Sequence, residues 1–209
     1  LASEKSIAVV ANILVTICIA RHLLPDGYGQ LSFLLALVAL AGPLMALGLN
    51  SLLSRELINR SNDTNQIIFS ALLVRFLSGL VVAFAASIFA YCYLEQWDLL
   101  AILMFSSIFN AAMVIDFWLQ ANLANTYGVF VRLTSLLLFN MLRIAAVLLD
   151  AKLSVYVYLS GLEIIFQAWL YLTLYLRLKD GQKKLCFSIA ECKNLLMESR
   201  WLLVSGISA

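Results

Sequence analysis

Six long runs of apolar residues constrain the fold of this chain more than any other feature. They cover residues 6–20, 30–49, 68–94, 99–119, 129–149 and 153–176, and a seventh run begins at Trp201. A helix needs about 20 mostly apolar residues to cross the roughly 30 Å core of a bilayer, because each residue adds 1.5 Å. Buried strands are shorter and alternate in polarity. The runs therefore predict an all-α membrane bundle of six transmembrane helices plus a truncated seventh.

The overall composition supports a polytopic membrane protein. Hydrophobic residues make up 63% of the 209 residues, charged residues only 12%, and the mean hydropathy is +0.95. A soluble domain has about 45–50% apolar and about 25% charged residues. These values exclude a soluble globular domain, intrinsic disorder and a disulfide scaffold. The net charge of +2 gives no reason to expect a nucleic-acid partner.

The polar segment that follows the sixth run divides the chain. We expect residues 1–176 to form one six-helix lobe, residues 177–200 an amphipathic cytoplasmic connection, and residues 201–209 the start of the seventh helix, with a second lobe missing. Nine helical residues span only about 13 Å, less than half of the hydrocarbon core. The connection is interpreted either as a solvated linker with some helix or as a surface that binds lipid headgroups.

Lysine and arginine in the connections predict the orientation. The connections after the second, fourth and sixth runs carry nine of them, whereas the opposite side carries only Arg21 and Lys152. Cytoplasmic loops are enriched in these two residue types. The N-terminus and the 177–200 segment are therefore predicted to be cytoplasmic.

Arg143 and Glu163 are the clearest charges inside predicted helices. They lie 8.5 residues before and 11.5 residues after the midpoint of the turn at Ala151 and Lys152. The mismatch of three residues is about 4.5 Å along the helix axes, which an arginine side chain can bridge. A charge at the bilayer centre costs roughly 2.5–3.5 kcal/mol or more. The spacing therefore predicts that the two side chains pair.

Arg75 and Asp116 form a second predicted set. They lie 21 and 20 residues from Gln96, at the centre of another turn, so they should reach a similar depth. Two interpretations of the four charges stay open. They either form two structural ion pairs or line a polar cavity that a charged substrate or a coupling ion crosses. In the second interpretation Arg143 contacts the anion, because arginine can donate two parallel hydrogen bonds to a phosphate.

Residues that would support an enzyme are scarce. The single histidine, His22, lies in a predicted turn, and the sequence holds no glycine-rich phosphate loop, nucleophile elbow or metal-binding motif. The four cysteines are interpreted as structural or incidental. Four amides within the runs would act as interhelical hydrogen-bonding groups or add to a wet interior: Asn12, Asn110, Asn140 and Gln167. We therefore expect no catalytic residue, no metal, no cofactor and no enzymatic activity.

Residues 20–29, with the sequence ARHLLPDGYG, resemble the signature A-R-Y-L-G-P-E-x-[YF]-G of Wzx-type polysaccharide flippases. Three weaker segments follow in the order expected for that family, at residues 47–57, 117–121 and 198–203. His22 stands where the signature has tyrosine, and Leu24 where it has glycine. Pro25, Gly27 and Gly29 are expected to supply the turn.

The resemblance implies a member of the multidrug/oligosaccharidyl-lipid/polysaccharide exporter superfamily with two six-helix lobes. It further implies transport of an undecaprenyl-pyrophosphate-linked oligosaccharide across the bacterial inner membrane, by rocking of one lobe against the other. The partners would be this lipid-linked substrate, membrane lipids, a coupling ion (H⁺ or Na⁺) and other polysaccharide-assembly proteins. Two alternatives stay open: a cation-coupled multidrug exporter, and a membrane enzyme acting on lipid-linked sugars.

Overall fold

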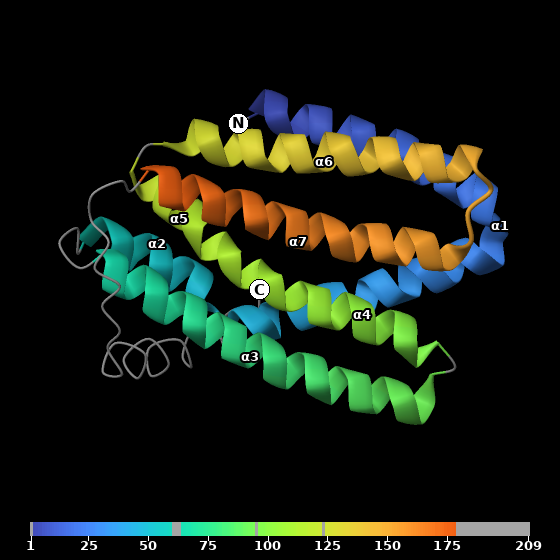
Figure 1. Cartoon of the computed structure of the whole chain (residues 1–209), viewed down its shortest axis with the longest axis horizontal. Helices are drawn as coiled ribbons and strands as arrows, with labels where there is room; N and C mark the ends of the chain where they lie inside the picture. Colours follow the sequence, from blue (N-terminus) through green and yellow to red (C-terminus); the bar gives the residue numbers. More distant parts are fainter. Residues whose placement is uncertain (1, 60–63, 95, 123, 179–209) are drawn as a thin grey trace.

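The chain is helical throughout the part that the computed structural model describes, which is residues 2–59, 64–94, 96–122 and 124–178 (Figure 1). The elements in chain order are α1 (Ala2–Ala46), α2 (Leu49–Asn59), α3 (Thr64–Tyr93), α4 (Trp97–Ser107), the 3₁₀ helix η2 (Ile108–Met113), α5 (Val114–Ala121), α6 (Asn125–Leu148) and α7 (Leu153–Leu178). No strand occurs among these residues. The predicted all-α class is confirmed.

Within the described residues, five helical segments are long and apolar enough to span a membrane. They are Val9–Ala46, Asn65–Tyr93, Trp97–Ala121, Asn125–Leu148 and Leu153–Leu178. The sequence predicted six complete spans; the difference arises because the first two apolar runs are joined in α1. The predicted connection, from residue 179 onward, and the predicted seventh helix lie outside the described residues.

A sharp kink at Leu24 divides α1 into a first arm (residues 2–23) and a second arm (residues 25–46). Leu24 has φ 59° and ψ 170°, which are not helical angles. The residue before a proline is disfavoured in the helical region, and Pro25 follows directly. Gly27 and Gly29 lie within regular helix, so the expectation that these glycines supply the turn is wrong. The two arms run in different directions in Figure 1.

The kink lies at the same end of the bundle as two interhelical turns. The His22 ring donates from Nε2 to the carbonyl oxygen of Ala151, in the α6–α7 turn, at 3.1 Å. Gln96, in the α3–α4 turn, donates to the side-chain oxygen of Gln30 at 2.9 Å. The histidine is thus a boundary residue that ties the kink to a neighbouring turn.

The long helices lie side by side in the order α6, α7, α4 and α3 (Figure 1). The first arm of α1 packs on α6, and the second arm packs against α3 and α4. The segment Trp97–Ala121, which joins α4, η2 and α5, is the most buried of the five spans. This central segment therefore contacts helices on both sides and presents residues to each.

The second arm of α1 ends just before a left-handed turn. Pro43 lies inside this helix, which continues to Ala46 without a break. Leu47 and Gly48 then have φ values of 49° and 66°. Glycine is common at such a position because it has no Cβ to clash.

Helix α2 was not predicted, because its residues were interpreted as a connection. Its leucines at positions 49, 52, 53 and 57 follow helical spacing and are all buried. They form one hydrophobic cluster with Ile67, Ala71 and Val114, from α3 and α5. This packing fixes the start of α2 close to the interior of the bundle.

Candidate functional site

The Arg143–Glu163 pair forms as the sequence predicted. Arg143 of α6 donates from Nη2 to Glu163 Oε2 of α7 at 2.6 Å. The same guanidinium also donates to Ser160 Oγ and to Asn140 Oδ1, each at 3.2 Å. A paired and hydrogen-bonded charge is far less costly inside a membrane protein than a lone one. The geometry is confirmed, while a substrate contact at this pair stays a prediction.

Two of the amides noted in the sequence link the first arm of α1 to α6. Asn140 donates from Nδ2 to Asn12 Oδ1 at 3.0 Å, and Asn140 also accepts from Arg143. Both asparagines therefore serve as interhelical hydrogen-bonding groups, one of the two roles expected of them. Asn110 instead lines the cavity described below.

Asp116 lies in a buried polar network at the junction of α5, α6 and α7. Its Oδ1 accepts from Arg132 Nη1 at 2.6 Å and from Tyr171 Oη at 3.1 Å, and its Oδ2 accepts from Gln120 at 2.9 Å. The predicted partner, Arg75, takes no part in these bonds. The interpretation of Arg75 and Asp116 as an ion pair is therefore wrong.

The reason for this error is the rotation of α5 about its own axis. The prediction that Arg75 and Asp116 lie at a similar depth was right. The ring of Phe117, the neighbour of Asp116, lies 5.6 Å from the guanidinium carbon of Arg75. Successive helical residues point about 100° apart, because the helix has 3.6 residues per turn. Phe117 consequently faces α3, whereas Asp116 faces α6 and α7.

The partner of Asp116 could have been found by the reasoning that found the Arg143–Glu163 pair. The turn between α5 and α6 is centred at residue 123, with Asp116 seven residues before it and Arg132 nine residues after it. The mismatch of two residues is about 3 Å along the axes. Arg132 lies next to a predicted connection and was counted among the loop charges, so its pairing with Asp116 was not predicted.

Arg75 is buried between helices without a carboxylate partner among the described residues. Only 5% of its surface is exposed. It hydrogen-bonds to the side-chain oxygen of Asn50, at the start of α2, and its guanidinium lies over the Phe117 ring. Its Nε has no hydrogen-bond partner. Nothing in the sequence pattern pointed to Asn50 as its neighbour.

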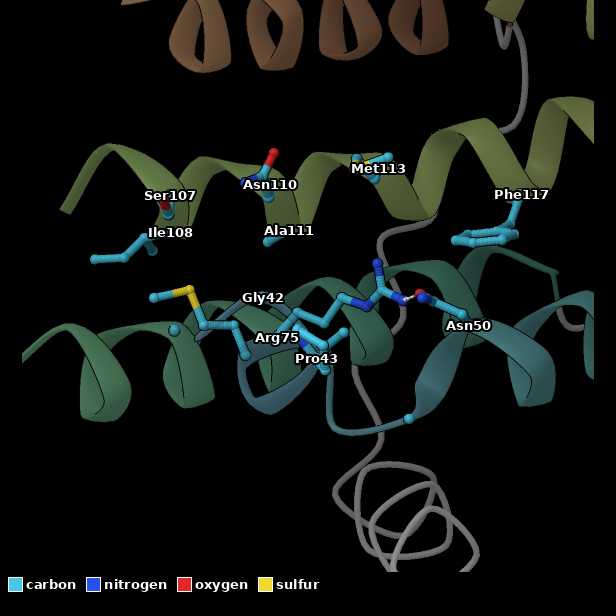
Figure 2. A pocket seen from close by; sticks show the side chains of 14 residues that line it. Gly42, Pro43, Asn50, Arg75, Ser107, Ile108, Asn110, Ala111, Met113 and Phe117 are labelled. Atoms are coloured by element: carbon cyan, nitrogen blue, oxygen red, sulfur yellow. Dashed lines mark hydrogen bonds between the residues drawn. The ribbon is translucent and has the colours of Figure 1, made fainter. Parts of the chain in front are cut away.

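A cavity of about 430 Å³ lies beside Arg75. The end of α1, the start of α2, α3 and the central segment with η2 form its walls, and Asn50, Asn110 and Phe117 are among its lining residues (Figure 2). In Figure 2 the Arg75 side chain reaches between Pro43 and Phe117 toward Asn50. The cavity is thus largely apolar, with one buried cation and two amide side chains among its lining residues.

No grouping of three or more His, Cys, Asp or Glu side chains suited to a metal ion occurs in the part of the chain that the structure describes. Cys18 and Cys92 are free and exposed on the helices. The expectations of no metal, no cofactor and no enzymatic activity stay predictions.

The fold and these buried charges define an all-helical, multi-pass membrane protein with a partly polar interior. The chain belongs to the polysaccharide biosynthesis protein family, whose model matches residues 1–209. The resemblance noted in the sequence is thereby confirmed, and the family assigns the protein a role in polysaccharide biosynthesis. No curated protein and no solved structure gives a significant match to the chain.

Proposed function

We propose that the protein is a flippase that moves undecaprenyl-pyrophosphate-linked oligosaccharide across the bacterial inner membrane, for a surface polysaccharide such as O-antigen or capsule. The observation that carries this proposal is the family match along the whole chain. The multi-pass helical bundle supports it, because a transporter needs a path lined by protein through the bilayer. The reaction is movement of the substrate without covalent chemistry.

The balance of buried charge favours an anionic substrate. Among the charged side chains of the five spans that are buried or half-buried, three are arginines (75, 132 and 143) and two are carboxylates (Asp116 and Glu163). A multidrug exporter for cationic compounds would be expected to show the opposite balance. The pyrophosphate of a lipid-linked glycan is the complementary ligand, and H⁺ or Na⁺ is the proposed coupling ion.

The proposal includes six membrane crossings in the described lobe. The apolar segment of α1 has 38 residues, or about 57 Å of helix, which is nearly twice the hydrocarbon thickness. Its kink is hydrogen-bonded to the turns after α3 and α6. Each arm of α1 would then cross once, with the kink and these turns outside and the N-terminus in the cytoplasm.

The function is tested by locating the glycan lipid in cells that lack the full-length protein. We expect it to accumulate in the inner leaflet, where an impermeant lectin added to spheroplasts does not reach it, and to become accessible again when the gene is restored. Glycan assembly that stops before this intermediate forms would replace the proposal with an enzyme. An unchanged glycan together with increased retention of a cationic dye would replace it with a drug exporter.

A further inference from the structure

We propose that the cavity beside Arg75 is an anion subsite that binds a phosphate group. The inference concerns one part of the bundle: the end of α1, the start of α2, α3 and η2. It rests on the proposed function only for the source of the phosphate, which is the pyrophosphate of the lipid-linked glycan rather than an ordinary phospholipid headgroup.

Arg75 differs from Arg132 and Arg143, the two half-buried arginines of the described bundle, because no carboxylate of the described residues neutralises its charge. Arg132 and Arg143 are each neutralised by a carboxylate at 2.6 Å. Arg75 is more deeply buried, and its contacts are the neutral Asn50 oxygen and the face of Phe117. A buried ion without a counter-charge is strongly unfavourable, so such a site is completed by a ligand of opposite charge.

The donors at this position suit a phosphate. The Nε of Arg75 is buried without a hydrogen-bond partner, and a guanidinium can donate two parallel bonds to phosphate oxygens. Asn110 of the 3₁₀ helix also lines the cavity, but its amide points away from Arg75 (Figure 2), so the guanidinium supplies these donors. The site thus offers directed donors as well as charge.

The start of α2 adds positive electrostatic potential to the cavity beside Arg75. This helix of 11 residues begins at Leu49, and Gly48 and Asn50, on either side of that position, line the cavity. The helix dipole favours an anion at the start of a helix. The buried guanidinium and the helix start therefore flank one space.

The size of the cavity fits a ligand group rather than a single ion. Its volume of about 430 Å³ falls within the range of roughly 300–1,000 Å³ found for small-molecule sites. Its walls come from three separate stretches of the sequence, residues 42–50, 75–79 and 107–117 (Figure 2). The last of them contains the 3₁₀ stretch of the central helix, and such stretches often mark functional positions.

The test measures binding of inorganic pyrophosphate to the purified full-length protein in detergent, by calorimetry. The decisive variant is Asn50→Asp, which places a carboxylate where an amide oxygen now accepts from Arg75. We expect it to weaken binding at least tenfold while the melting temperature stays equal or rises, because the buried guanidinium gains a counter-charge. Arg75→Gln should weaken binding to a similar extent.

The matched control is Asn140→Asp, which makes the same exchange beside Arg143, an arginine that Glu163 already neutralises. We expect its affinity to stay within threefold of the wild type. The proposal is overturned if the wild type does not bind pyrophosphate, if Asn50→Asp binds normally, or if Asn140→Asp causes the larger loss. The last outcome would assign the anion to Arg143.

Competition distinguishes the two sources of phosphate. Geranyl pyrophosphate should displace the bound pyrophosphate, whereas short-chain phosphatidylglycerol at the same concentration should not. Displacement by phosphatidylglycerol alone would overturn the assigned source. A wild-type protein that exposes the glycan outside but binds no pyrophosphate would overturn the subsite and leave the proposed function intact. Pyrophosphate binding without glycan movement would overturn the proposed function and leave the subsite intact.

Discussion

Leu24 carries the least favourable backbone conformation of the kink in α1. Its φ of 59° with ψ of 170° is a combination that residues with a Cβ rarely adopt, and 66% of its surface is exposed. The family signature resembled by residues 20–29 has glycine at this position. Glycine adopts positive φ without a steric penalty, so the backbone gives a physical reason for that preference.

Leu24→Gly should stabilise the protein by about 1 kcal/mol, because strain of this kind costs about 1–3 kcal/mol and the added flexibility of the unfolded chain offsets part of the gain. The measurement is thermal unfolding in detergent, where the variant should melt at the higher temperature. Leu24→Ala is the control: it removes the exposed side chain but keeps the Cβ, so it should not share the gain. Equal gains in both variants would contradict the explanation.

The junction of α5 and α6 is held by a close approach at Gly128. A Cβ built at this glycine would overlap the Asp116 carboxylate, which Arg132 and Tyr171 hold in place. The glycine therefore makes room for the buried network. The missing side chain at Gly128 also lets α5 and α6 pack closely enough for the 2.6 Å ion pair between Asp116 and Arg132.

Gly128→Ala should destabilise the protein by about 3 kcal/mol, because separating a buried pair costs about 3–5 kcal/mol and the side chains can relax in part. Gly29→Ala is the matched control, since a Cβ there would meet nothing within 4 Å. Alanine is the better helix former by about 0.5–1 kcal/mol, so this control should be neutral or slightly stabilising. Similar melting temperatures for the two variants would show that the junction tolerates the added atom.

The α6–α7 hairpin depends in a similar way on the Arg143–Glu163 pair. Arg143→Ala should lower the stability by about 3 kcal/mol because the half-buried Glu163 is left inside a membrane span without its partner. The double variant Arg143→Glu with Glu163→Arg should recover part of this loss, measured by thermal unfolding. Its transport activity tests the role predicted from the sequence: a folded but inactive swap supports an anion contact at Arg143, and near-normal transport leaves the pair a packing role.

At the scale of the whole molecule, the kink in α1 decides how the lobe sits in the membrane. The hydrogen bonds of His22 and Gln30 bring the kink to the end that holds the α3–α4 and α6–α7 turns. The side chain of Asp150, in the second of these turns, is 95% exposed. This end is the one with few lysines and arginines, and the cationic bias predicts that it faces away from the cytoplasm.

Cysteine labelling tests this arrangement in a protein whose four native cysteines are replaced by serine. Asp150→Cys should react with an impermeant maleimide on intact spheroplasts. Lys183→Cys, in the predicted cytoplasmic connection, should react only after the membrane is permeabilised. Labelling of the second variant alone on intact spheroplasts would reverse the orientation, and labelling of both would contradict the six-crossing proposal.

The helical class, the positions of most long helices and the Arg143–Glu163 pair could be predicted from the residues along the chain. Long apolar runs indicate membrane helices without knowledge of their packing. A short turn between two adjacent helices fixes which of their residues reach the same depth. This local rule also applies to Asp116 and Arg132. Family membership was likewise visible, in the motif at residues 20–29 and the order of the segments after it.

The bend in α1, the packing of α2 and the surroundings of Arg75 depend on contacts between helices and could not be predicted from the sequence. Hydropathy and spacing give depth along a helix axis but not the rotation about it, so Phe117 rather than Asp116 faces Arg75. The neighbour of Arg75, Asn50, comes from a helix whose position depends on buried leucines packing against α3 and α5. Contacts of this kind are set by the packing of several helices at once, and no single segment of the sequence encodes them.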